Sequence, residues 1–222
     1  QAPTGKPDPA TSATTGHDDL PRSDRLEDWA LLPTRPDWAG GLRETWTPGE
    51  AGAFERLDAF LSDRLADYAG HRDEPGAAVT SMLSPHLRFG EISPRRIWAA
   101  AEHRADDGRT AVGDRTLAKF QAELGWREFS HHLLFHFPTL PRDNFQPKFD
   151  AFPWREDEAE FRAWTRGQTG YPLVDAGMRE LWHTGYIHNR VRMVVGSFLV
   201  KHLLMDWRKG EAWFWDTLVD AD

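Results

Sequence analysis

The stretch TLAKFQAELGWREFSHHLLF (residues 116–135) decides the fold, because its apolar residues recur at the three- to four-residue period of a helix. Phenylalanine and leucine side chains cover most of its circumference, and a helix that is apolar nearly all round is buried. Four residues on one face interrupt this apolar surface: Glu123, Trp126, Arg127 and Ser130. A polar stripe on a buried helix either forms ion pairs or lines a cavity, and the sequence leaves both open.

The segments on either side of this helix also have helical periods. The motif Thr47-Pro48-Gly49-Glu50 is typical of a capping box and predicts a helix that starts at Pro48. No segment shows the alternation of a strand. We therefore expect an all-α fold from about residue 47, with further helices at 93–107, 157–166, 173–183, 187–205 and 211–218.

A second polar stripe lies on the expected helix 187–205. Asn189, Met193 and Gly196 share one face of it. A glycine inside a helix costs about 1 kcal/mol relative to alanine. Gly196 therefore indicates the close approach of another helix or of a ligand.

Composition narrows the function only broadly. The chain has 11 tryptophans, no cysteine and a formal charge of −8. Disulfides, thiolate metal sites and cysteine nucleophiles are excluded, and the acidic balance argues weakly against nucleic acid. With no apolar run of membrane-spanning length and no apolar signal segment, we expect a cytoplasmic protein without a membrane span.

Two further patterns leave alternatives open. The hydroxyl-rich loop Thr80–Ser84 suits a phosphate group, although such strings are common in loops. Two Glu-x-x-His motifs, at Glu128–His131 and Glu180–His183, are the pattern of a di-iron helical bundle. That reading needs two more inward carboxylates, which the sequence does not identify.

Four segments together resemble the photolyase and cryptochrome family: TSMLSPHLRFGEIS (80–93), ELGWREFSHH (123–132), TGYPLVDAGMRELWHTGYIHNRVRM (169–193) and SFLVKHLLMDWRKGEAWF (197–214). The resemblance covers roughly residues 50–222. It implies the helical FAD-binding domain of that family, most like a class I cyclobutane pyrimidine dimer photolyase. In this family a light-excited, reduced flavin donates an electron to a pyrimidine dimer flipped out of DNA.

The resemblance also assigns roles to residues. FAD contacts are implied for Tyr68, Thr80, Ser81, Met82, Leu83, Ser84, Arg127, Asn189, Arg192, Asp220 and Asp222. Catalytic contacts to the dimer are implied for Glu123, Trp126, Asn189 and Met193. DNA contacts are implied for Glu123, Trp126, Arg127, Ser130, Asn189 and Arg190, and electron transfer for Trp154 and Trp207.

Within the family, Asn189 together with Met193 resembles enzymes that repair cyclobutane dimers. Enzymes for the (6-4) photoproduct carry histidine at both positions, and plant-type cryptochromes tend to carry aspartate at the first. Tyr186 stands where many members have tryptophan. The resemblance thus implies a deoxyribodipyrimidine photo-lyase, a carbon–carbon lyase acting on DNA that contains pyrimidine dimers. The alternative is a cryptochrome-like blue-light sensor without repair activity.

The resemblance further implies how the chain is organised. We expect residues 1–46 to be a proline-rich, partly disordered linker, and residues 47–222 to be a FAD- and lesion-binding domain that is incomplete at its C-terminus. The family's N-terminal antenna domain, which holds a folate or deazaflavin chromophore, is not in the sequence. We therefore expect a monomer that binds FAD poorly and does not repair DNA alone, without a bound metal.

Overall fold

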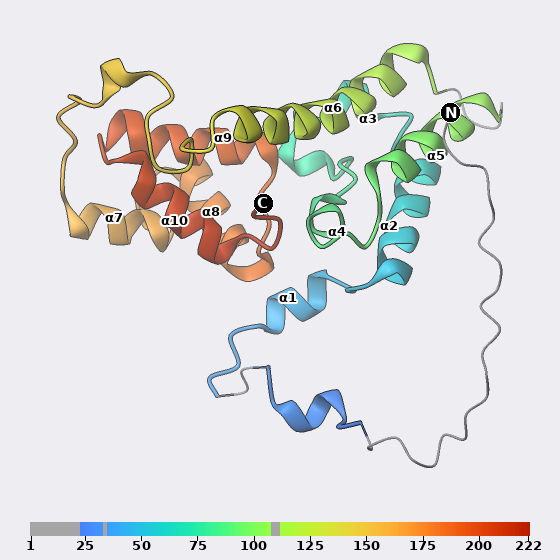
Figure 1. Ribbon diagram of the computed structural model, residues 1–222, viewed down its shortest axis with the longest axis horizontal. Helices are drawn as coiled ribbons and strands as arrows, with labels where there is room; N and C mark the ends of the chain where they lie inside the picture. Colours follow the sequence, from blue (N-terminus) through green and yellow to red (C-terminus); the bar gives the residue numbers. More distant parts are fainter. Residues whose placement is uncertain (1–22, 33–34, 108–111) are drawn as a thin grey trace. The chain divides into compact units, whose positions relative to one another are not determined.

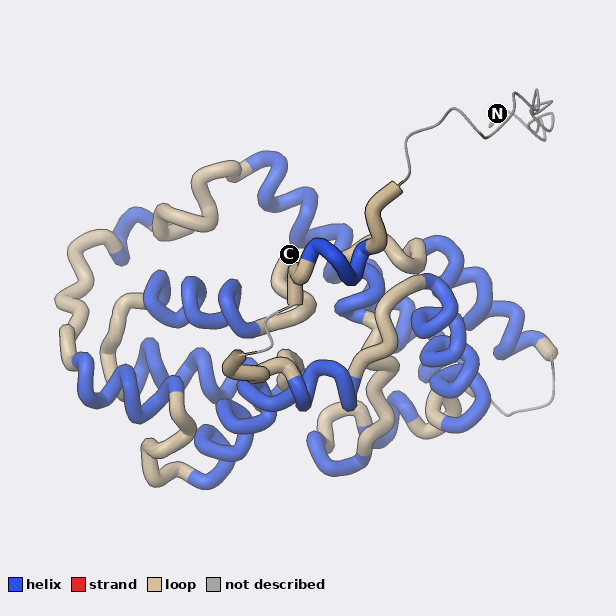
Figure 2. Tube along the Cα trace, turned by 90° about the horizontal axis from the view of Figure 1, so that it is seen from below, coloured by secondary structure: helices blue, strands red, loops and turns tan. Residues whose placement is uncertain are grey.

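The computed structural model describes residues 23–32, 35–107 and 112–222. The chain divides into two units, residues 1–38 and 39–222. Among the described residues of the first unit, one 3-10 turn forms, η2 (Leu26–Trp29). The described parts of the chain contain helices and loops but no strand, which confirms the all-α prediction (Figure 2).

The second unit contains the elements that build the site. Its helices follow one another along the chain as Figure 1 labels them. They are α1 (Gly40–Thr45), α2 (Glu50–Asp63), α3 (Tyr68–His71), η3 (Pro75–Ala77), α4 (Ser84–Arg88), α5 (Pro94–Asp106), α6 (Asp114–His136), η4 (Pro147–Phe149), α7 (Glu158–Thr165), α8 (Pro172–Thr184), α9 (Asn189–Ser197), η5 (Phe198–His202) and α10 (Trp207–Thr217).

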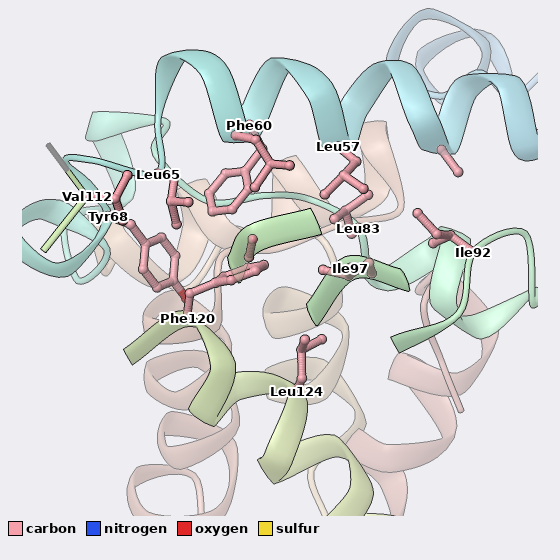
Figure 3. Packing of buried hydrophobic residues seen from close by; sticks show 13 residues of the cluster. Leu57, Phe60, Leu65, Tyr68, Leu83, Ile92, Ile97, Val112, Phe120 and Leu124 are labelled. Atoms are coloured by element: carbon pink, nitrogen blue, oxygen red, sulfur yellow. The ribbon is translucent and has the colours of Figure 1, made fainter. Parts of the chain in front are cut away.

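A first apolar core lies between α2, α3, α5 and α6. Phe60, Tyr68 and Phe120 meet at its centre, with ring centroids between 4.7 and 5.8 Å apart (Figure 3). Leu83 and Ile97 are also buried in this cluster. Ser93 accepts a hydrogen bond from the backbone N–H of Arg96 and so caps α5, as the sequence predicts.

A second core is built by α7 to α10 and η5. Trp164 is fully buried there, and its indole N–H donates to the carbonyl of Val195 over 3.2 Å. Gly177 and Gly210 permit close packing, since an added Cβ would lie 2.4 Å from Val191 and 2.5 Å from Leu199. The two cores are separate clusters of buried residues, and polar contacts join them.

Trp46 makes one of these connections. Its indole N–H donates to the carbonyl of Thr184, at the end of α8, over 2.6 Å. The guanidinium of Arg56, on α2, lies 4.7 Å from the centre of the indole ring. The helix before it, α1, packs on α8. The helical unit thus begins at Ala39, within the stretch assigned to the linker from the sequence. Residues 1–22 of that stretch lie outside the described residues.

The expected capping box at residues 47–50 is wrong. Helix α2 begins at Glu50 and has Gly49 as its N-cap, with no side-chain cap. The N–H of Gly49 instead donates to Glu91, 2.8 Å away, and Gly49 takes a φ of 98°. A carboxylate 42 residues away therefore makes the bond that the local motif led us to expect from Glu50.

The helix expected over residues 187–205 is shorter. Helix α9 ends at Ser197 and continues as the π-helical turn η5. An added Cβ on Gly196 would meet no atom within 4 Å. No other helix of the described structure therefore approaches Gly196, and the approach of a ligand stays a prediction. Helix α10 begins at Trp207 rather than 211, because Asp206 caps it by accepting from the N–H of Arg208.

Within the described ranges, every helix is either too short or too polar to cross a bilayer.

Two adjacent glycines test the packing of α1 on α8. A Cβ at Gly41 would lie 2.1 Å from the backbone oxygen of His183, whereas one at Gly40 meets nothing within 4 Å. We expect Gly41→Ala to lower the free energy of unfolding by about 1–3 kcal/mol through overpacking. Gly40→Ala should leave it unchanged or raise it by up to about 1 kcal/mol. Urea unfolding measures both, and equal effects would contradict the packing described.

Candidate functional site

A cavity of about 430 Å³ lies beside the first core, and none of the described residues of the second core lines it. Tyr68, Leu83 and Phe120 of the first core line one side of it. Residues around the start of α9 line the other side. Its size falls within the range of small-molecule sites, roughly 300–1,000 Å³. Among the sequence-predicted site residues, those lining it are Tyr68, Thr80, Ser81, Met82, Leu83, Ser84, Glu123, Trp126, Arg127, Ser130, Asn189, Arg190, Arg192, Asp220 and Asp222.

Helix α6 supplies one wall. The stripe predicted from the sequence lines the cavity, and two of its members are ion-paired, Glu123 with Arg72 and Arg127 with Asp222. The expected burial of the whole helix is wrong, because the first core covers only its N-terminal half: Phe120 and Leu124 are buried, and residues 128–132 and 134–136 are exposed.

Glu123 accepts a short hydrogen bond from the guanidinium of Arg72. Trp126 is 62% exposed and contacts Phe129 edge-on. The hydroxyl of Ser130 donates to the carbonyl of Trp126 over 2.9 Å. This wall therefore carries charged groups inside the cavity and an aromatic ring where the cavity is open to solvent.

The start of α9 supplies the facing wall. The buried side chain of His188 caps this helix by accepting from the N–H of Arg190. Arg190 Nε donates to Asp73 over 2.9 Å, and this hydrogen bond lowers the pKa of the Asp73 carboxyl. Asn189 lies between His188 and Arg190 and is exposed at the cavity. The wall thus offers an amide and a guanidinium beside each other.

The C-terminal segment closes a third side. Val219 N–H donates to the carbonyl of Gly185, which places the following residues at the cavity. The carboxylate of Asp220 is 5% exposed and lies 3.1 Å from Arg192 Nη2. Asp222 pairs with Arg127, on α6, over 2.9 Å. Two carboxylates are thereby held against two guanidiniums.

The loop before α4 lines the cavity with hydroxyl and backbone groups. Met82 takes the left-handed conformation, with a φ of 52°, which is uncommon for a side chain of this size. Its sulfur lies 3.7 Å from Arg56 Nη1. Beside the loop, burial raises the pKa of Tyr68 to about 12, so its hydroxyl stays protonated at neutral pH and can donate.

Sequence reasoning missed several lining residues. Arg72, Asp73 and His188 belong to the cavity, as does Tyr186, for which the resemblance gave no definite contact. Burial raises the pKa of Tyr186. The sequence does contain a signal for Arg72, because it follows Tyr68 by four residues, the spacing of neighbours on one helix face. In the structure the Arg72 guanidinium lies 5.3 Å from the Tyr68 ring.

Met193 is not part of this cavity, contrary to the prediction that it shares a wall with Asn189. It is 57% exposed and lines a separate apolar hollow beside Tyr171 and Leu173. Met193 follows Asn189 by four residues on α9, but the residue of that turn that lines the cavity is Arg192, which pairs with Asp220. Arg190 Nη1 lies 3.9 Å from the Met193 sulfur.

The two tryptophans assigned to electron transfer also lie outside the cavity lining. Trp207 donates from its indole N–H to Asn144 over 2.8 Å, and Trp154 packs on Phe152 with ring centroids 4.4 Å apart. Among the described residues, no three His, Asp or Glu side chains gather closely enough to hold a metal ion. The two Glu-x-x-His motifs therefore do not meet in such a cluster.

The fold and the cavity define a helical domain that can bind a ligand with an aromatic system and anionic groups. Apolar side chains line part of the cavity, and guanidinium and hydroxyl groups line the rest. Comparison with known proteins agrees. Residues 120–222 match the family model described as the FAD binding domain of DNA photolyase.

Relatives extend the match over most of the chain. A deoxyribodipyrimidine photo-lyase of Agrobacterium fabrum is 55% identical over 91% of this chain and 41% of its own length. Cryptochrome-2 of Arabidopsis thaliana is 43% identical over 82% of this chain and 30% of its own. A crystal structure of a class III photolyase from Agrobacterium tumefaciens superposes with a TM-score of 0.85, at 55% identity, over 92% of this chain and 42% of that one.

The chain belongs to the photolyase and cryptochrome family and corresponds to its helical FAD-binding domain. It spans about two fifths of the length of the Agrobacterium relatives. One of these is described as class III, whereas the sequence resemblance was to class I. The class of this chain stays a prediction.

Two carboxylates at the cavity should differ in their effect on stability. Asp220 is nearly buried against Arg192, whereas Asp73 and Arg190 are both about half exposed. We expect Asp220→Asn to lower the free energy of unfolding by about 1–3 kcal/mol, because a guanidinium loses its charged partner. Asp73→Asn should lower it less, since water solvates that pair. Equal losses on thermal unfolding would contradict this ranking.

Proposed function

We propose that the cavity binds FAD, and that the protein uses this flavin for light-driven repair of cyclobutane pyrimidine dimers in DNA. One observation carries the proposal. The same cavity combines the nearly buried carboxylate of Asp220, paired with Arg192, with the exposed ring of Trp126 beside Glu123. A buried polar part suits a resident cofactor, and an exposed aromatic part suits a base that enters from outside.

The lining fits FAD in charge and in the kinds of group it offers. Arg72, Arg127, Arg190 and Arg192 offer positive charge for a diphosphate, and the hydroxyls of Thr80–Ser84 offer hydrogen bonds. Leu83, Leu87, Ile97, Phe120 and Leu124 offer apolar contact for flat rings. In addition, Arg192 Nε is buried without a partner among the described groups, so a donor remains for a ligand.

When bound, FAD supplies the electron and the absorption of light. The residues of this chain would position the flavin and the lesion and stabilise the charge that forms on the dimer. Glu123 would form a hydrogen bond with a dimer carbonyl in which its carboxyl O–H donates and the carbonyl accepts, and its contact with Arg72 fixes its orientation. Trp126 would pack on the flipped base. Asn189 and Arg190 would contact flavin, lesion or backbone phosphate from the facing wall.

DNA as a partner is compatible with a formal charge of −8. Phosphate binding depends on the local surface and not on the average charge. Arginine side chains line the cavity on three sides, and Arg190 is exposed beside Asn189. We further propose that Trp154 and Trp207 carry electrons toward the flavin, as the resemblance implies.

A light sensor without repair activity is the second candidate, because the relatives include a plant cryptochrome at 43% identity. Both candidates share the flavin cavity, so FAD binding does not separate them. Glu123 and Trp126 favour repair, since both reach the cavity in positions suited to a lesion.

FAD binding is tested at Tyr68. Its buried hydroxyl, protonated at neutral pH, can donate to a phosphate oxygen. We expect Tyr68→Phe to raise the Kd for FAD at least about tenfold, the effect of losing a hydrogen bond to a charged group. Tyr171→Phe is the matched control, because Tyr171 is 58% exposed and lies outside the cavity. Quenching of flavin fluorescence measures both, and unchanged affinity in Tyr68→Phe would count against the site.

Repair is tested at Glu123. Near-UV light and an oligonucleotide with one thymine dimer are supplied to the chain alone and to a chain extended to the length of its relatives. We expect Glu123→Ala in the extended chain to keep FAD and to lose about a hundredfold in repair. Glu128→Ala, on the same helix but away from this cavity, should repair normally. Bound FAD without repair in the unmodified extended chain would favour the sensor.

A further inference from the structure

We propose that His188 is a positioning residue that joins the two walls of the cavity only in its neutral form with the proton on Nε2, and that its protonation loosens the flavin site. The side chain is 7% exposed and lines the cavity. The hydrogen-bonding argument stands without a ligand. Its consequence for FAD rests on the proposed function.

The partners of the ring fix its tautomer. Nδ1 lies 3.2 Å from the backbone N–H of Arg190, which can only donate, so Nδ1 must accept. Nε2 lies 3.1 Å from the backbone carbonyl of Arg72, which can only accept, so Nε2 must carry the proton. One neutral tautomer satisfies both bonds, and neither the other tautomer nor the cation does.

The bond to Arg72 spans 116 positions of the chain, whereas the bond to Arg190 is local. Arg72 directly follows α3, beside the first core, and holds Glu123 on α6. Arg190 belongs to the first turn of α9, beside the second core, and holds Asp73. His188 thus sets the distance between the cavity wall that carries Glu123 and the wall that carries Asn189.

Protonation of His188 would place a hydrogen on Nδ1, facing the N–H of Arg190. The N-cap of α9 would be lost, and a third positive charge would stand beside Arg72 and Arg190. Asp73 is the facing carboxylate, and its Oδ1 already accepts from Arg190. Burial lowers the pKa of His188, and the bond to the Arg72 carbonyl opposes this only in part. Arg72 and Arg190 also lower the pKa of His188 and Asp73 raises it, and the net shift disfavours the cation.

The direction of the pH effect follows from linkage. An unfolded histidine titrates near 6.5, and the folded His188 has a lower pKa. Below pH 6.5 the unfolded chain binds more protons, so folding stability decreases as the pH falls. The decrease ends below the folded pKa, where both states are protonated.

The first experiment is ¹⁵N-detected NMR of the histidine rings in the chain without FAD. We expect His188 to be protonated on Nε2 and to titrate with a midpoint below 6.5. A proton on Nδ1, or a midpoint at or above 6.5, would overturn the proposal whether or not the chain binds flavin.

The second experiment uses His188→Asn, which keeps an N-cap acceptor but does not titrate. Wild-type affinity for FAD should fall by up to about tenfold per pH unit below the folded pKa, and the pH profile of the variant should be flatter. The variant should also bind more weakly than wild type at pH 7.5, because its shorter side chain loses the Arg72 carbonyl. Identical pH profiles would overturn the proposed switch.

Two controls separate the possible causes of failure. Circular dichroism establishes that His188→Asn is folded, and His188→Gln serves as the second variant if it is not. Protection factors for amide exchange at residues 189–192, measured without FAD, should drop at acid pH in wild type only. FAD affinity is measured on the chain extended to the length of its relatives. If that chain binds no FAD at any pH, the proposed function fails, while the NMR and exchange results still decide the role of His188.

Discussion

The hydrogen bonds and ion pairs that join two separately packed apolar cores are the interactions on which the site depends. Each core is closed by its own aromatic and aliphatic residues, so their facing surfaces remain free to line a cavity. Trp46 bonded to Thr184, His188 bonded to Arg72 and Arg127 bonded to Asp222 hold these surfaces at a fixed spacing. If apolar packing joined the cores instead, the space between them would be filled.

Polar contacts also explain how an acidic chain presents cationic groups. The cavity arginines are paired before any ligand arrives: Arg72 with Glu123, Arg190 with Asp73 and Arg192 with Asp220. Paired guanidiniums keep most of their N–H donors and hold one orientation, which lowers the entropy lost when an anion binds. The carboxylates therefore set the geometry of the site as much as they offset its charge.

The sequence was informative where a signal is local and failed where it is not. The stripe on α6 and the Ser93 cap are short-range patterns, and both appear in the structure. The bond from Glu91 to Gly49 and the role of Trp46 depend on residues that only the fold brings together. The resemblance located most of the cavity lining, because motifs preserve positions in a family. It could not show that Arg192, and not Met193, is the residue in the second turn of α9 that lines the cavity.

The predicted site residues fall into a buried group and an exposed group. This division supports one ligand that stays bound and another that binds and leaves. Tyr68, Leu83 and the Asp220 carboxylate are at most 5% exposed, and a ligand that contacts them is enclosed by protein. Trp126 is 62% exposed, so a partner that stacks on it can arrive and leave without disturbing either core. His188 lies on the buried side and contacts both walls. A movement that admits the transient ligand must therefore preserve the two hydrogen bonds of His188. Otherwise it releases the resident ligand as well.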